Sequence, residues 1–234
     1  MEKKVGIVVT VHWSEEIRPN GDFLLKRFLD SLYQYCTHNF CIYIIDNESQ
    51  FNLNVPNEKT KYIRIEDQNK KGLTGAWNLG LNTAYNDGCD IIINCNEDLW
   101  FNETINYFIE KIDLDNDEDV IYSSFTNGVH SPYKNYSNGE PREDLSLDLS
   151  KDYLNGFLFA FNRNHYYKFR YKNDQYFNVN NKYNGGDGKW GGQEGQFTEN
   201  AEHGARGLIV GKAFTFHDKI RAWRVGKRLD EGSN

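Results

Sequence analysis

The chain has 234 residues, of which 38% are hydrophobic and 15% aromatic, and its formal net charge is −7 at pH 7. This length suits one large α/β domain or two small ones, and the excess of acidic residues argues against nucleic-acid binding, which needs a basic surface. No apolar stretch approaches the ~20 residues that a membrane-spanning helix needs. The first apolar stretch is interrupted by His12 and closed by Glu15 and Glu16, a pattern unlike a signal peptide. We therefore expect a cytoplasmic protein without a transmembrane segment.

The first half of the chain alternates apolar strands with amphipathic helices. Leu24, Phe28 and Leu32, for example, recur every fourth position, which is helical spacing. Such alternation predicts a parallel, doubly wound sheet. The expected strands are 4–11, 41–45, 62–65, 90–95 and 120–124, and the expected helices are 22–36, 74–85 with Thr74 as its cap, and a third capped by Asn102.

The second half is less regular. Residues 156–161 and 208–216 are apolar enough to predict two further strands, and residues 163–200 combine aromatic side chains with Asn and Gly. No repeat and no linker divides the chain, so we expect one domain over residues 1–234. The four cysteines have no CxxC spacing, which favours free thiols over zinc ligands or disulfides.

An apolar strand that ends in acidic residues is the most informative motif. Residues 90–98 read DIIINCNED, so Asn96, Glu97 and Asp98 follow the strand at once. Open α/β sheets bind ligands at the carboxyl ends of their strands. Carboxylate oxygens there suit Mg²⁺ or Mn²⁺, and these ions suit phosphate-bearing substrates. The alternative is an acidic turn without a ligand.

Two other segments contain candidate ligand-binding residues. Asp46 ends the strand 41–45 as Asp98 ends the strand 90–95, although Asp46 could equally cap a turn through its side chain. The segment NKKGLTGAWNLGLNTA, residues 69–84, places glycines and lysines at the start of a helix. Free N–H groups at such a start attract anions. The segment contains neither a Walker loop nor GxGxxG.

Taken in order, VVTVHWSEE, IIDNES, NKKGLTGAWNLGLNTA and DIIINCNEDLWF resemble the nucleotide-sugar-binding half of the GT-A glycosyltransferases, especially the inverting family 2. The resemblance covers residues 4–125 well and the later part more loosely. It implies a GT-A fold of the α/β class: one Rossmann-like domain with a mostly parallel, mixed sheet flanked by helices. Residues 1–125 would form the nucleotide-sugar-binding half, 126–218 the acceptor and catalytic half, and 219–234 a basic and polar tail.

The resemblance also implies an activity: transfer of a sugar from a nucleoside diphosphate sugar to a hydroxyl of a glycan or glycoconjugate. The residues that it assigns to the donor site are Thr10, His12, Asp46, Lys71, Gly75, Asn78, Asn96 and Glu97. Asn96 is a departure, because the acidic motif of the family opens with Asp. An amide at position 96 weakens the metal site, or it requires Glu97 to ligate the metal in place of the missing carboxylate.

The remaining assignments concern the metal, the base and the acceptor. The resemblance makes Asp98 and His217 the ligands of Mn²⁺ or Mg²⁺, although a lone histidine is more often structural. It makes Glu194 the catalytic base, with Asp187 of the same glycine-rich loop as the alternative, or neither residue. Trp190, flanked by glycines, is the candidate for acceptor contact.

Rival functions remain at this stage. Asn96 fits a nucleotide-sugar-binding protein that has lost transfer activity. A sugar-phosphate nucleotidyltransferase shares the layered fold, but it should show a glycine-rich loop with arginine after the first strand, where this chain has VHWSEE. A structural or interaction role is a third and weaker possibility.

Overall fold

The computed structural model describes residues 3–15, 18–50, 58–66, 72–127, 141–178, 180–181, 183 and 193–218. In chain order its elements are β1 (Val5–Val11), α1 (Gly21–Tyr35), β2 (Phe40–Asp46), β3 (Thr60–Arg64), α2 (Leu73–Asn86), β4 (Ile91–Asn96), β5 (Leu99–Phe101), α3 (Thr104–Asp115), β6 (Val120–Thr126), β7 (Leu145–Leu147), β8 (Leu158–Asn162), α4 (Arg163–Phe169), α5 (Gly195–Ala201) and β9 (Arg206–His217).

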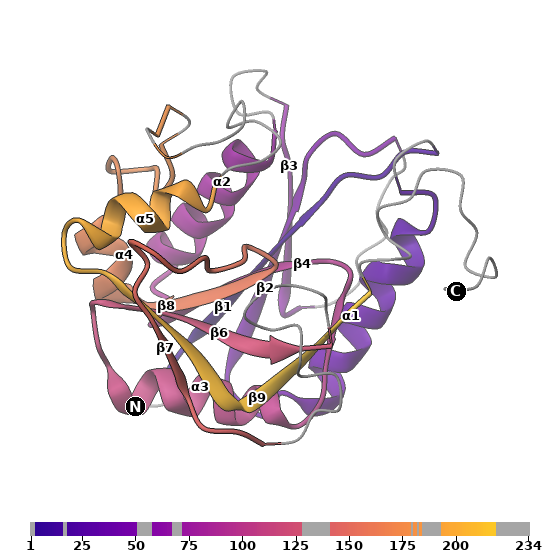
Figure 1. Cartoon of the computed structure of the whole chain (residues 1–234). Helices are drawn as coiled ribbons and strands as arrows, with labels where there is room; N and C mark the ends of the chain where they lie inside the picture. Colours follow the sequence, from indigo (N-terminus) through magenta and orange to yellow (C-terminus); the bar gives the residue numbers. More distant parts are fainter. Residues whose placement is uncertain are drawn as a thin grey trace, which may run out of the picture.

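One sheet runs through both halves of the described chain (Figure 1). Its order is β3-β2-β1-β4-β8-β6-β9-β5, and β7 pairs with β9 beside this path. Strands β3, β2, β1 and β4 are parallel, β8 is antiparallel to β4 and β6, and β6 is parallel to β9. The sheet is therefore mixed but mostly parallel, and the expected α/β fold class is confirmed.

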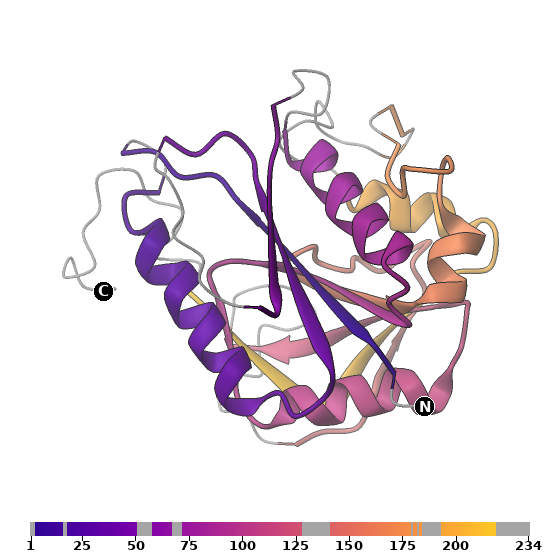
Figure 2. The same ribbon diagram turned by 180° about the vertical axis from the view of Figure 1, so that it is seen from behind.

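Helices cover both faces of the sheet. Figures 1 and 2 show α2, α4 and α5 together on one side and α1 and α3 on the other. Helix α2 packs on β1, β2 and β4, whereas α3 packs on β9. Strands β1, β6 and β8 are buried along their whole length, as expected when helices cover both faces of a sheet.

Aromatic side chains fill the space between α2, β8 and α5. The Trp77 and Phe159 rings meet edge to face with centroids 5.4 Å apart, and Phe177 and Phe197 complete the cluster. Such edge-to-face pairs are a preferred aromatic geometry. This packing attaches the second half of the chain to α2 and fixes the start of α5.

The predicted elements of the first half are confirmed within about two residues at most ends, with corrections to two predicted caps. Helix α2 begins at Leu73 and its N-cap is Gly72, so Thr74 lies inside the helix instead of capping it. Gly72 has φ 87°, a conformation that glycine adopts without steric cost. The N-cap of α3 is Glu103 and not the predicted Asn102, although the side chain of Asn102 accepts hydrogen bonds from the N–H and hydroxyl of Thr104.

Four elements were not predicted: β5, β7, α4 and α5. Each is too short for a hydrophobic period to be recognised. The four cysteines are free thiols, as expected. Among the described residues, no helix has the length and apolar character required to cross a bilayer.

Candidate active site

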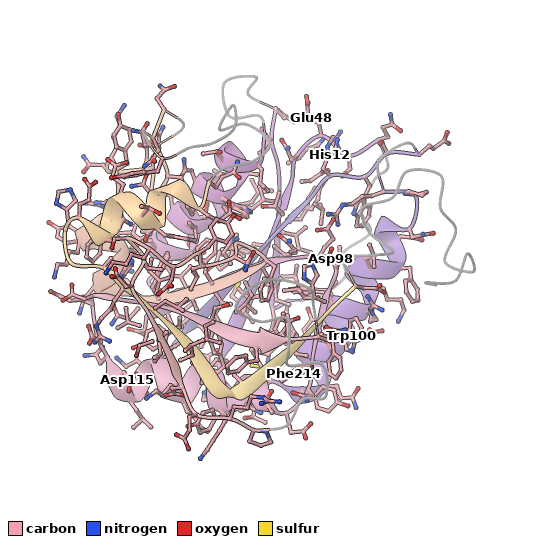
Figure 3. The ribbon with its side chains drawn as sticks, viewed as in Figure 1. His12, Glu48, Asp98, Trp100, Asp115 and Phe214 are labelled. Atoms are coloured by element: carbon pink, nitrogen blue, oxygen red, sulfur yellow. The ribbon has the colours of Figure 1, made fainter. Side chains whose placement is uncertain are left out.

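The carboxyl ends of three parallel strands meet at one edge of the sheet. Thr10 of β1 is in register with Asn96 of β4, and Val11 of β1 is in register with Asp46 of β2. The predicted donor-site residues Thr10, Asp46 and Asn96 therefore lie in neighbouring strands at the same level. Figure 3 shows His12 and Glu48 beyond these strand ends, with Asp98 below them in that view. This edge is where open α/β sheets bind ligands.

Asp46 is fully engaged by the protein itself. One carboxylate oxygen accepts the N–H of Ser49 at 2.7 Å, and the other accepts the Tyr62 hydroxyl at 2.5 Å and the Arg64 guanidinium at 2.9 Å. The first bond holds the turn in which Glu48 has φ 62°. The turn-capping alternative is thus present in the structure. A donor contact by Asp46 stays a prediction, and it would have to be made around Tyr62 and Arg64.

Asp98 and His217 are brought together by the pairing of β5 with β9. Leu99 pairs with His217 in that antiparallel ladder, and the N–H of Asp218 donates to the carbonyl oxygen of Asp98 at 2.9 Å. Nε2 of His217 consequently lies 3.4 Å from Oδ1 of Asp98, and both side chains are almost completely buried. Burial alone would raise the pKa of Asp98, but His217 and Arg18 hold that pKa below its ordinary value.

Arg18 is a positively charged side chain that lies against the acidic residues Glu97 and Asp98. Its Nη1 lies 2.5 Å from Oε1 of Glu97 and 4.0 Å from Oδ2 of Asp98. Burial raises the pKa of Glu97 to about 7, and the nearby negative charge of Asp98 adds to this, although Arg18 opposes the shift. The two neighbouring carboxyl groups therefore differ: Asp98 holds its negative charge near neutral pH more firmly than Glu97 does.

Glu194 stands directly before α5 and is only partly buried. Its Oε1 accepts the main-chain N–H of Gly156 at 3.1 Å. The next residue, Phe157, accepts the N–H of Asn96 at 2.9 Å and stacks its ring on the imidazole of His217 at 5.2 Å. One dipeptide before β8 therefore links the predicted base to Asn96 and to the predicted metal ligand His217.

Helix α2 borders this region through residues that hold the fold. The side-chain amide of Asn78 donates to the carbonyl oxygen of Phe177 at 3.0 Å and accepts its N–H at 2.8 Å. Asn78 therefore anchors the chain after α4, and a donor contact by this side chain stays a prediction. Nε2 of Gln193 donates to the Thr74 hydroxyl at 2.9 Å, which places the residue before Glu194 against the start of α2.

Several predicted residues cannot be placed beside this cluster. Lys71, Asp187 and Trp190 lie outside the described residues, as does the tail from 219 onward. Gly75 lies in the first turn of α2. Nδ1 of His12 lies 2.5 Å from the carbonyl oxygen of Asn47, so its imidazole joins the loops that follow β1 and β2.

The donor set suits a hard or borderline divalent cation. Both carboxylate oxygens of Asp98 are buried without a well-formed hydrogen bond from the described residues. The contacts with His217 at 3.4 Å and with Arg18 at 4.0 Å offset this cost only in part, and a bound cation would offset more of it. A carboxylate beside an imidazole fits Mn²⁺, and a carboxylate with phosphate oxygens fits Mg²⁺. In the described part of the chain, no three His, Cys, Asp or Glu side chains converge as a closed metal site. The residues therefore fit an open site with two protein ligands.

Comparison with known protein families identifies the family of this chain. The sequence profile described as "Glycosyl transferase family 2" matches residues 20–183. The chain belongs to this family. The match covers more than half of the chain and contains every element from α1 to α4, including the acidic cluster after β4.

Solved structures support the GT-A fold of this family 2 chain. S. aureus TarS 1-349 is similar with a TM-score of 0.61 at 16% identity, over 92% of this chain and 60% of that one. TarS is similar with a TM-score of 0.61 at 17% identity, over 92% and 36%. TarS 1-349 in complex with UDP-GlcNAc is similar with a TM-score of 0.56 at 16% identity, over 99% and 62%. This chain thus spans about three fifths of TarS 1-349. No curated protein sequence matches it significantly.

Two contributors to the site of this family 2 chain were missed by sequence reasoning. Arg18 lies 79 positions from Glu97 in a loop without periodicity, and Gly156 lies 38 positions from Glu194. An arginine next to a proline in a loop does not by itself indicate an ion pair, and a glycine before a strand does not indicate a hydrogen bond to a carboxylate. Only the acidic cluster itself gave a reason to look for a cation nearby.

Proposed function

We propose that this chain transfers a sugar from a nucleoside diphosphate sugar to a hydroxyl group of a glycan or glycoconjugate, with inversion at the anomeric carbon. The observation that carries the proposal is the link through Gly156 and Phe157. It connects Glu194 to the buried pair of Asp98 and His217 within a family 2 fold. A base beside a site for a diphosphate is what inverting transfer requires.

Glu194 would act as the base. Its carboxylate takes the proton of the acceptor hydroxyl while the acceptor oxygen forms a bond to the anomeric carbon, and the bond from that carbon to the diphosphate oxygen breaks. The electron pair of the broken bond leaves with the nucleoside diphosphate. The N–H of Gly156 orients the carboxylate through its bond to Oε1. The same bond therefore fixes the position of Oε2, the oxygen that is left to accept the proton. Asp187 stays the alternative base.

Asp98 and His217 would hold Mn²⁺ or Mg²⁺, with diphosphate oxygens completing the coordination. A bound divalent cation neutralises the negative charge that develops on the leaving diphosphate. Arg18 supplies a second positive charge beside Glu97. This arrangement requires Asp98 to be ionised, and its lowered pKa favours that state.

The donor is proposed to be a uridine diphosphate sugar. TarS 1-349 has been solved in complex with UDP and with UDP-GlcNAc, which supports this donor class, and the edge formed by Thr10, Asn96 and the loop after β2 is where we propose that the donor binds. Donor contacts by His12, Asp46, Lys71, Gly75 and Asn78, and an acceptor contact by Trp190, belong to the same proposal.

A screen of nucleotide sugars tests the donor and the metal together. A ligand that binds only the folded state raises stability by RT ln(1 + [L]/Kd), so the true donor should raise Tm most, and more with Mn²⁺ than with EDTA. Transfer to a hydroxyl acceptor should then be detected as release of the nucleoside diphosphate. If no UDP-sugar shifts Tm with or without Mn²⁺, the proposed donor class is wrong.

A second candidate function follows from Asn96. An amide in place of the first acidic residue fits a chain that binds a nucleotide sugar without transferring it. In that case the Tm shift persists but no nucleoside diphosphate is released with any acceptor. Replacing Asn96 by Asp should then strengthen Mn²⁺ binding without creating turnover.

A further inference from the structure

The end of β9 is held in place on both sides of His217. The N–H of His217 donates to Oδ1 of Asn127 at 2.7 Å, and the N–H of Asp218 donates to the carbonyl oxygen of Asp98 at 2.9 Å. These bonds fix the main chain but not the side chains that flank the imidazole, Phe216 and Asp218. What holds those two side chains decides how firmly His217 is held against Asp98.

Arg27 of α1 contacts Asp218 directly and Phe216 through the ring of Trp100. Its guanidinium lies 4.0 Å from the centroid of the Trp100 ring, and Trp100 stacks on Phe216 with centroids 4.9 Å apart and planes 8° apart. Its Nη1 also donates to Oδ2 of Asp218 at 3.1 Å. A single side chain 191 positions away in sequence from Asp218 thus contacts the residue after His217 directly and the residue before it through Trp100. Figure 3 shows Trp100 below Asp98, beside the end of β9.

The surroundings of Arg27 are unusual for an ordinary surface arginine. Its side chain is only 22% exposed, and Nε and Nη2 are buried and donate to no described residue. A buried donor without an acceptor costs free energy. Stacking on indole and the ion pair with Asp218 are the interactions that offset this cost. Both of them act on the segment that carries His217.

We propose that Arg27 is a positioning residue that fixes the end of β9, so that the imidazole of His217 stays against the carboxylate of Asp98. The inference rests on the proposed function, in which these two residues hold a divalent cation. Without the guanidinium, Trp100 loses its cation–π contact and Asp218 loses its ion pair with α1. Partners that orient metal ligands are typically worth about 10–100-fold in metal affinity.

Mn²⁺ titration followed by the EPR signal of free Mn²⁺, without nucleotide and with UDP, tests the role of Arg27. We expect Arg27→Met to weaken Mn²⁺ binding about tenfold or more, and Arg27→Lys to recover part of the loss because it keeps the charge near Asp218. The matched control is Lys26→Met, which removes a neighbouring charge from the exposed face of α1, where Lys26 pairs with Asp30. This control should bind Mn²⁺ as the wild type does.

A double-mutant cycle separates positioning from general loosening. If Arg27 acts through His217, the variant with both Arg27→Met and His217→Ala should bind Mn²⁺ no more weakly than His217→Ala alone. Additive losses, or wild-type affinity in Arg27→Met, would overturn the role of Arg27. If Arg27→Met does not fold, unchanged affinity in Arg27→Lys does the same. Failure of the wild-type chain to bind Mn²⁺ under either condition would instead overturn the metal function, and the inference with it.

Discussion

The main-chain N–H of Gly156 donates a hydrogen bond to Oε1 of Glu194 at 3.1 Å. A Cβ atom on residue 156 would lie 2.8 Å from that same oxygen and 2.7 Å from the edge of the Trp77 ring. The absence of a side chain at Gly156 therefore allows the approach of the proposed base. The hydrogen bond then fixes which way the carboxylate points.

Gly156→Ala should consequently misplace Glu194. We expect the substitution to lower kcat by about 10–100-fold, because a displacement of the order of 1 Å at a reacting group is enough for such a loss. Overpacking against Trp77 should also cost about 1–3 kcal/mol of stability. Adding Trp77→Phe to Gly156→Ala relieves the clash of the new methyl group with the ring at position 77, but it leaves the clash with Glu194. The double variant should thus regain Tm without regaining kcat, and recovery of both would show that Glu194 was not displaced.

Glu194→Gln should remove the base while keeping the bond from Gly156, since an amide oxygen also accepts. We expect transfer to fall by about 10²–10⁴-fold, with the donor-induced Tm shift unchanged. Glu199→Gln is the matched control and should stay active, because Glu199 lies in helix α5, which begins directly after Glu194, and is bonded to Asn181. Full turnover in Glu194→Gln would direct attention to Asp187.

Asp98→Asn should abolish the part of donor binding that depends on Mn²⁺. An amide keeps the size of the side chain but removes the negative charge that the buried pair with His217 provides. Isothermal titration of UDP with and without Mn²⁺ measures the difference. The control is Asp90→Asn. Asp90 lies just before the opposite end of β4, where its carboxylate accepts the N–H of Lys4, so this substitution should leave the Mn²⁺ effect intact. Equal titrations for wild type and Asp98→Asn would count against the metal site.

The buried histidine of α4 should make folding stability depend on pH. His165 stacks on Phe161, its Nδ1 and Nε2 lie 2.8 Å from the carbonyl oxygen of Glu118 and the hydroxyl of Tyr176, and burial lowers its pKa to about 3. In the unfolded chain the pKa is about 6.5. Between these values the unfolded state binds more protons, so stability falls as the pH decreases through this window.

The loss at pH 5 relative to pH 7 should be about 2 kcal/mol, because each pH unit below 6.5 costs about 1.4 kcal/mol. Urea unfolding of His165→Gln and of the wild type at pH 5 and pH 7 measures this loss. It is the difference between the two proteins in how much their free energy of unfolding changes between the two pH values. The exposed His203 supplies the control, His203→Gln, which should follow the wild-type curve. A His165→Gln curve parallel to that of the wild type would refute the assignment.

Membership of family 2 favours the transferase over the nucleotidyltransferase and over a purely structural role. It leaves the difference between transfer and binding alone to be decided at Asn96 and Glu194. The two residues are linked through Gly156 and Phe157. The effects of substitutions at Asn96 and at Glu194 can therefore be compared directly.

The sequence by itself determined the layered α/β fold and the strand ends at which Asp46, Asn96 and Asp98 lie. Local periodicity carries this information, since each buried strand and each amphipathic helix of the first half shows its own pattern. The same reasoning missed β5 and α5, which are three and seven residues long. Their side chains are too few to show a period.

Only the tertiary structure decided how the site is assembled. The pairing of β5 with β9 brings His217 to Asp98, and α1 brings Arg27 to Asp218 across 191 positions. It also showed that the amide of Asn78 and the carboxylate of Asp46 are engaged by the protein. Contacts between residues so far apart depend on sheet order and packing, which hydrophobic periodicity does not record. The sequence therefore located the acidic end of β4, whereas strand pairing and helix packing determine which residues surround it.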